Sequence, residues 1–239
     1  MDNHSRYKFK ELGYYLEKNL FHKGETKEIK EHFMKCRLEG PKPGDLGGDE
    51  HKGSNDPLNK YPRFINMHKW DKITANLIND KRLFENAKFL INNEILLYQT
   101  MLYFKPPGAR GQGLHQDHQY IREYPLIGVW LALDDCDKEN GQMMVIPKSN
   151  KLGLLEVEET DMTKSFTTGQ SVIPKNSNII GIDMKCGDVL FFDGFLIHGS
   201  YLNTSKTRFR RAFITHYYSK NYGVIPMDLS KSMKKFNYN

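Results

Sequence analysis

The stretch LIGVWLALDDCDKENGQMMVIP, residues 126–147, indicates a β fold. It contains two short apolar runs, 126–133 and 142–147, separated by the turn-rich stretch DDCDKENG. Short apolar runs bounded by Asp, Asn and Gly are typical of β-strands, because these residues favour the backbone conformations of turns. We therefore expect the two runs to form a hairpin.

Similar runs lie on both sides of this stretch. Residues 179–184 and 189–192 are expected to form a second hairpin about Gly187–Asp188, and two further strands are expected at 96–104 and 208–219. Several short strands with turn signals and no helix between them predict an antiparallel barrel or sandwich.

The first 95 residues have helical periodicity instead. Helices are expected over 25–39, which ends before Gly40 and Pro41, over 69–79, and after the capping residue Asp80. Residues 40–57 form a long loop rich in Gly, Pro and Asp. We expect a single α+β domain over 1–239, with a largely helical part (1–95), a β core (96–220) and a tail (221–239).

Composition narrows the class of protein. With 38% apolar and 12% aromatic residues, the chain has enough material for a globular core. No apolar run approaches the roughly 20 residues of a membrane helix, and the N-terminus lacks the apolar region of a signal peptide. Cys36, Cys136 and Cys186 form no CxxC pair, which argues against a disulfide framework. A cytoplasmic protein without membrane association is expected, as a monomer or homodimer.

The net charge of +6 raises the question of nucleic acid. The lysines are spread along the chain, and no RNP, helix-turn-helix or zinc-finger pattern accompanies them. We therefore expect no nucleic-acid partner, and a small-molecule substrate, polar or anionic, that the positive charge attracts.

The segment LHQDHQY, residues 114–120, places His115 and Asp117 two positions apart. In an extended segment these side chains point to the same face and can reach one metal ion. A second histidine, His198, follows the apolar run in FFDGFLIHGS. Two imidazoles and one carboxylate are the ligands of non-haem Fe(II) oxygenases, and they leave coordination positions open for a bidentate cosubstrate and O2.

Three arginines follow His198: Arg208, Arg210 and Arg211. A guanidinium binds a carboxylate through two parallel hydrogen bonds, so an arginine inside a metal-containing barrel predicts a dicarboxylate such as 2-oxoglutarate. Strand alternation places Arg210 on the same face as Ala212 and Ile214, which favours Arg210 but leaves the other two open.

The order of these motifs resembles the phytanoyl-CoA dioxygenase family. The matching motifs, over roughly 96–218, are HQD, the Trp-containing strand, LDDCDKENGQMMVIPKSN, GDVLFF, HGS and RRA. The resemblance implies a double-stranded β-helix (a cupin-like jelly roll), iron at His115, Asp117 and His198, and 2-oxoglutarate held by Arg210. It also implies that Gln116, Trp130 and Ser200 line the pocket. PKSN at 147–150 and a His198-to-RRA gap one residue longer than usual depart from the family pattern.

The expected function is an Fe(II)- and 2-oxoglutarate-dependent dioxygenase that hydroxylates a small metabolite and releases succinate and CO2. Related halogenases replace the carboxylate ligand with a small residue, so Asp117 favours hydroxylation. The alternatives are a cupin-type metalloenzyme that does not use 2-oxoglutarate, and a non-catalytic binding or sensing protein. His118 and Asp193 are expected to be structural, His216 is left unassigned, and the loops 40–57 and 154–178 are candidate lids.

Overall fold

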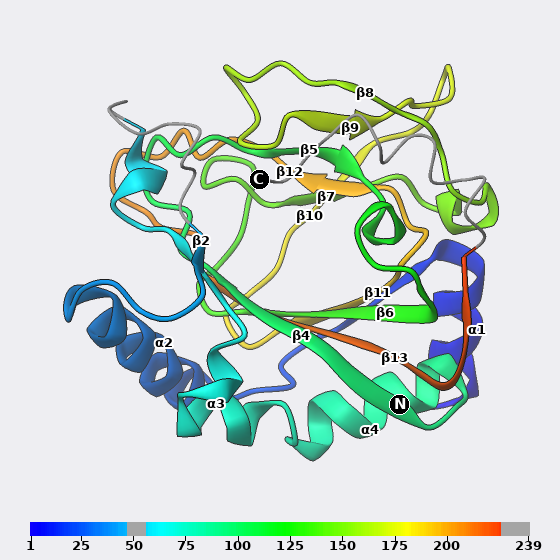
Figure 1. The fold of residues 1–239 in the computed structure, drawn as a ribbon, viewed down its shortest axis with the longest axis horizontal. Helices are drawn as coiled ribbons and strands as arrows, with labels where there is room; N and C mark the ends of the chain where they lie inside the picture. The colour runs from blue at the N-terminus through cyan, green and yellow to red at the C-terminus, as the bar shows by residue number, and fades with distance from the viewer. Residues whose placement is uncertain (47–55, 226–239) are drawn as a thin grey trace.

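The computed structural model of the protein describes residues 1–46 and 56–225. Most of the loop 40–57, with its Asp49 and His51, and most of the expected tail lie outside the described residues. Figure 1 shows two β-sheets stacked face to face, with helices against the outer face of the larger one. None of the helices in the described ranges is long and apolar enough to cross a membrane.

The larger sheet has seven strands and the smaller sheet has four, all paired antiparallel. The order in the larger sheet is β1 (Tyr14–Glu17), β11 (Val189–Asp193), β6 (Glu123–Ala132), β13 (Ala212–Val224), β4 (Ile95–Tyr103), β3 (Arg63–Ile65) and β2 (Asp45–Leu46). The order in the smaller sheet is β10 (Ile180–Ile182), β7 (Met143–Val145), β12 (His198–Ser200) and β5 (Gln112–His115). β8 (Val157–Glu159) and β9 (Gly169–Ser171) form a separate pair. The expected jelly roll is confirmed.

Both expected hairpins are wrong. β6 lies in the larger sheet between β11 and β13, whereas β7 lies in the smaller sheet between β10 and β12. The same holds for β10 and β11, which follow each other in sequence but belong to different sheets. The turn-rich stretches therefore connect the two sheets, and they pair with each other through a bridge between Cys136 and Met184. A turn signal shows where a strand ends, but not whether the chain stays in its sheet.

The expected helices are confirmed with small shifts in their bounds. The structure has α1 (Asn3–Leu12), α2 (Lys23–Leu38), α3 (Lys72–Leu77) and α4 (Lys81–Ile91), with short 3-10 turns at Pro57–Asn59, Met67–Lys69 and Ser149–Lys151. The Asp80 carboxylate accepts a hydrogen bond from Arg82 N and so caps α4 as expected. β1 was not expected, because its pairing with β11, some 170 residues away, is what makes it a strand.

The larger sheet separates two apolar cores. On its outer face, residues such as Phe33, Leu90 and Phe213 pack between the sheet and the helices. On its inner face, Trp130, Met143 and Ile214 pack between the two sheets. Successive residues of β6 and of the first half of β13 alternate between these cores, which explains why both segments are largely buried.

Candidate metal centre and cavity

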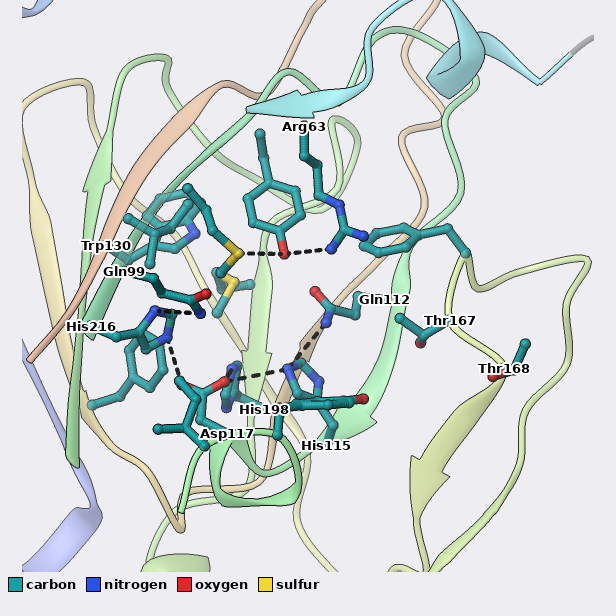
Figure 2. Close-up of a pocket in the computed structure, with 18 residues that line it drawn as sticks. Arg63, Gln99, Gln112, His115, Asp117, Trp130, Thr167, Thr168, His198 and His216 are labelled. Carbon is teal, nitrogen blue, oxygen red and sulfur yellow. Dashed lines mark hydrogen bonds and ion pairs between the residues drawn. The ribbon is translucent and has the colours of Figure 1, made fainter. Parts of the chain in front are cut away.

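A cavity of about 210 Å³ lies between the two sheets (Figure 2). Strands of both sheets line it, β3 of the larger sheet among them, together with the 3-10 turn η4 (Asp117–Gln119) and the segment 166–168. The lining side chains include Arg63, Gln99, Gln112, His115, Asp117, Trp130, Thr167, Thr168, His198 and His216. A concave site with an apolar wall and a few convergent polar groups is the usual form of a small-molecule site.

His115, Asp117 and His198 converge at one end of the cavity. His115 and His198 face each other across the β5–β12 pair, and Asp117 follows at the start of η4. One ligand atom from each residue lies within 4.8 Å of the others, and Asp117 Oδ1 is 3.7 Å from His115 Nε2 and 3.6 Å from His198 Nε2. All three side chains are buried. The spacing and donor set fit a facial triad around one Fe(II) ion.

Backbone carbonyls orient both imidazoles. His115 Nδ1 lies 2.9 Å from Gly113 O, and His198 Nδ1 lies 3.0 Å from Leu196 O. Because a carbonyl can only accept, each Nδ1 bears the proton and each Nε2 offers its lone pair to the centre. Burial, followed by the neighbouring His198, lowers the pKa of His115 to about 3, so this ring is neutral near pH 7.

His216 completes the centre, although the sequence analysis left it unassigned. Its Nε2 lies 2.9 Å from Asp117 Oδ2, while its Nδ1 lies 3.4 Å from Gln99 Nε2. Burial raises the pKa of Asp117, but the nearby His216 and His198 outweigh it and hold that pKa well below its usual range. His216 shares the face of Ala212 and Ile214 on β13, and this parity was the available signal. The separation of six positions between Arg210 and His216 suggested that His216 lies too far from the site, but the cavity extends along β13.

The three candidate arginines differ in their partners. Arg208 makes ion pairs with Asp137 and Glu139, and Arg211 makes a two-pronged ion pair with Asp134. Arg210 is buried, with its guanidinium 5.2 Å from the centre of the Trp130 ring and its Nε donating to Gly141 O. Within residues 1–46 and 56–225, no carboxylate lies within ion-pair distance of Arg210.

Lys105 is a second buried cation in this region, and sequence reasoning missed it. Its Nζ donates to Ser200 Oγ at 2.8 Å and to the carbonyl of Tyr201, and its own carbonyl accepts from Arg210 N. Burial, with the nearby Arg210 adding to it, lowers the pKa of Lys105 well below its usual value. Two adjacent buried basic side chains that have no carboxylate partner among the described residues favour an anionic ligand beside them.

The remaining expected pocket residues have different positions. Trp130 lines the cavity, whereas Ser200 contacts Lys105 and Gln112 N without belonging to the lining. Gln116 does not line the cavity either. Its amide donates to Gly153 O and Phe195 O and accepts from Leu155 N, so it anchors the loop around 153–155. Successive side chains of an extended segment point to opposite faces, so Gln116 points away from the face shared by His115 and Asp117 and lies outside the cavity.

Two other expectations concern structural residues and a lid. His118 is buried against Phe195, with its Nδ1 2.9 Å from Ile121 O, and is not part of the metal centre. Asp193 ends β11 and its carboxylate accepts from Phe195 N, which is a turn contact as expected. The segment 154–178 contributes Phe166, Thr167 and Thr168 to the cavity wall and therefore covers part of the site.

Comparison with known proteins agrees with this arrangement. The family model described as phytanoyl-CoA dioxygenase (PhyH) matches residues 9–212. A phytanoyl-CoA dioxygenase of Arabidopsis thaliana is 28% identical over 161 residues, 63% of this chain and 54% of that protein. An ectoine dioxygenase of Halomonas elongata is 25% identical over 248 residues, 95% of this chain and 73% of that protein. The chain spans about half the length of the first curated relatives it matches.

Among solved structures, EvdO2 from Micromonospora carbonacea var. aurantiaca, complexed with 2-oxoglutarate, superposes with a TM-score of 0.76 at 17% identity. The match covers 94% of this chain and 93% of that one. Fold and site thus define a jelly-roll protein with a buried His-Asp-His cluster that fits one metal ion. The chain belongs to the phytanoyl-CoA dioxygenase family. The expected iron agrees with the ligand set of the triad, and the similar EvdO2 structure contains 2-oxoglutarate.

Proposed function

We propose that this protein is an Fe(II)- and 2-oxoglutarate-dependent dioxygenase that hydroxylates a small polar or anionic metabolite and releases succinate and CO2. The observation that supports this most strongly is the pairing of a buried His-Asp-His cluster with a buried arginine that has no carboxylate partner among the described residues. Burying an arginine without an anionic partner is costly, and the carboxylate of 2-oxoglutarate would supply that partner.

In this proposal His115, Asp117 and His198 hold the iron. When bound, iron and 2-oxoglutarate together supply the oxidising chemistry that replaces a substrate C–H bond with C–OH. Arg210 binds the far carboxylate of 2-oxoglutarate, with Lys105 and Ser200 beside it, and Trp130 forms an apolar wall. The apolar lining excludes water from the reacting groups.

Asp117 also supports hydroxylation over halogenation. Its Oδ2 contacts His216, which leaves Oδ1 facing the two histidines. The carboxylate thus fills the position that a halide needs, and His216 fixes its orientation.

Asp117→Ala tests the metal centre. Removing one of three ligands should weaken iron binding, measured by anaerobic titration. It should also abolish the Fe(II)-dependent conversion of 2-oxoglutarate to succinate, measured in air. Asp193→Asn is the matched control, because its side chain keeps an oxygen that can accept from Phe195 N. Succinate release by Asp117→Ala at the wild-type rate would contradict the triad.

Arg210→Met tests the 2-oxoglutarate site. Because charged hydrogen bonds contribute about 1.5–3 kcal/mol each, the KM for 2-oxoglutarate should rise about tenfold or more. Arg211→Met removes a neighbouring arginine that is already paired with Asp134 and should leave that KM within about twofold of wild type. If Arg211→Met raised the KM for 2-oxoglutarate more than Arg210→Met did, Arg210 would not be the residue that binds the carboxylate.

A further inference from the structure

Arg63 occupies the end of the cavity away from Asp117 (Figure 2). It lies on β3, next to Phe64, whose side chain is buried in the core beneath the helices. Since successive side chains of a strand point to opposite faces, Arg63 points the other way, into the cavity. In Figure 2 its guanidinium lies on the side where Gln112, Thr167 and Thr168 face the cavity.

Aromatic rings hold this guanidinium in place. Its Nη1 donates to the Tyr103 hydroxyl at 3.1 Å, and its Cζ is 5.4 Å from the centre of the Tyr103 ring and 5.0 Å from that of Phe166. Both separations are within the range of cation–π attraction. An arginine held by two rings loses little further freedom when it binds a ligand, and it presents a planar set of donors.

The guanidinium has unused donors and no anionic partner among the described residues. The tyrosine hydroxyl accepts from only one of its five N–H groups. Among the described residues that line the cavity, Asp117 is the only carboxylate, and it contacts His216 at the opposite end. Arg110, which precedes β5, differs from Arg63 because it forms an ion pair with Asp56.

We propose that Arg63 is a specificity-determining residue that binds a carboxylate or phosphate group of the substrate. The proposal rests on the proposed oxygenase function and narrows its substrate to an oxyanion-bearing small molecule. The anionic group binds at Arg63, with the Thr167 and Thr168 hydroxyls lining the same side, and the rest of the molecule extends along the cavity toward the triad. A substrate whose charge is fixed at one end presents a defined C–H bond at the other.

The test uses three pools of probes: small carboxylic acids, the primary amides that match them, and small phosphate monoesters. Two responses are measured. The first is the rate of succinate release with a pool, divided by the rate of the same protein without a pool. The second is the melting temperature of the anaerobic protein with Fe(II) and 2-oxoglutarate, with and without a pool. In the wild type, we expect the acid or the phosphate pool to act at concentrations about tenfold or more below those of the amides. The anionic pool that produces the response shows whether the group bound at Arg63 is a carboxylate or a phosphate.

Variants then locate the effect. Arg63→Met should lose the preference for anions, and Arg63→Lys should retain part of it, because a lysine keeps the charge without the planar donors. Lys220→Gln removes the same charge from an exposed residue outside the cavity lining and should respond as the wild type does.

An equal response of the wild type to acids, phosphates and amides, a failure to respond to any pool, or an anion preference that persists in Arg63→Met would overturn the proposal. These outcomes are distinct from failure of the oxygenase function, because wild-type succinate release without a pool, compared with that of Asp117→Ala, tests that function separately.

Discussion

At the scale of single residues, Asp117 shows how one carboxylate serves two purposes. Its Oδ1 faces His115 and His198, and its Oδ2 accepts from His216. A metal ligand with one free oxygen can rotate, whereas a hydrogen bond to the other oxygen fixes the plane of the carboxylate. Partners of this kind support ligands in many metal sites.

His216→Phe should therefore weaken iron binding without removing a ligand. Loss of such a supporting contact typically costs about 10- to 100-fold in metal affinity or activity, so we expect a change of that size in Fe(II) affinity, measured by anaerobic titration. His216→Gln keeps a donor at this position and should recover part of the affinity. Equal affinities in His216→Phe and the wild type would show that the contact does not support the ligand.

At the scale of elements, the segment 160–168 covers the cavity because contacts outside the cavity hold it there. Arg110 Nη1 donates to the carbonyls of Met162 and Ser165, and its Nε donates to Asp56. Gly111 forms a parallel bridge with Ser165. These contacts place Phe166, Thr167 and Thr168 in the cavity wall without any regular strand at those positions.

Arg110→Gln should loosen this segment while leaving the sheets intact. A glutamine cannot bridge two carbonyls and a carboxylate at once, so amide hydrogen exchange over 160–168 should become about tenfold faster or more. Exchange in β6 and β13 should stay as in the wild type, which serves as an internal control. Unchanged exchange over 160–168 would mean that the bridge at Ser165 is sufficient to hold the segment.

At the scale of the whole molecule, the site depends on the way two layers are assembled. The larger sheet is covered by helices on its outer face, so its inner face is free to meet the smaller sheet (Figure 1). Each layer contributes part of the centre: β5 and β12 bring the two histidines, while β13 brings His216. The contact of His216 with Asp117 therefore forms only when the two sheets pack against each other.

Much of this could be predicted from the sequence. The i, i+2 spacing of His115 and Asp117 and the His-Gly-Ser motif at His198 are local patterns, and the structure brings these three residues together. The parity of Arg210 with Ile214 is also a local pattern, and the role of Arg210 stays a prediction. The helices after Asp80 and over 25–39 were equally local, because their caps and stop signals lie within a few residues of their ends.

Only the tertiary structure decided the rest. The contacts of His216 with Asp117 and of Lys105 with Ser200 join residues 99 and 95 positions apart. Arg63 faces the cavity only because β3 pairs with β4 in the larger sheet. The sequence by itself determined which residues can bind a metal and which apolar runs form strands. It did not determine which sheet each strand joins, because that choice depends on burying apolar faces between distant segments.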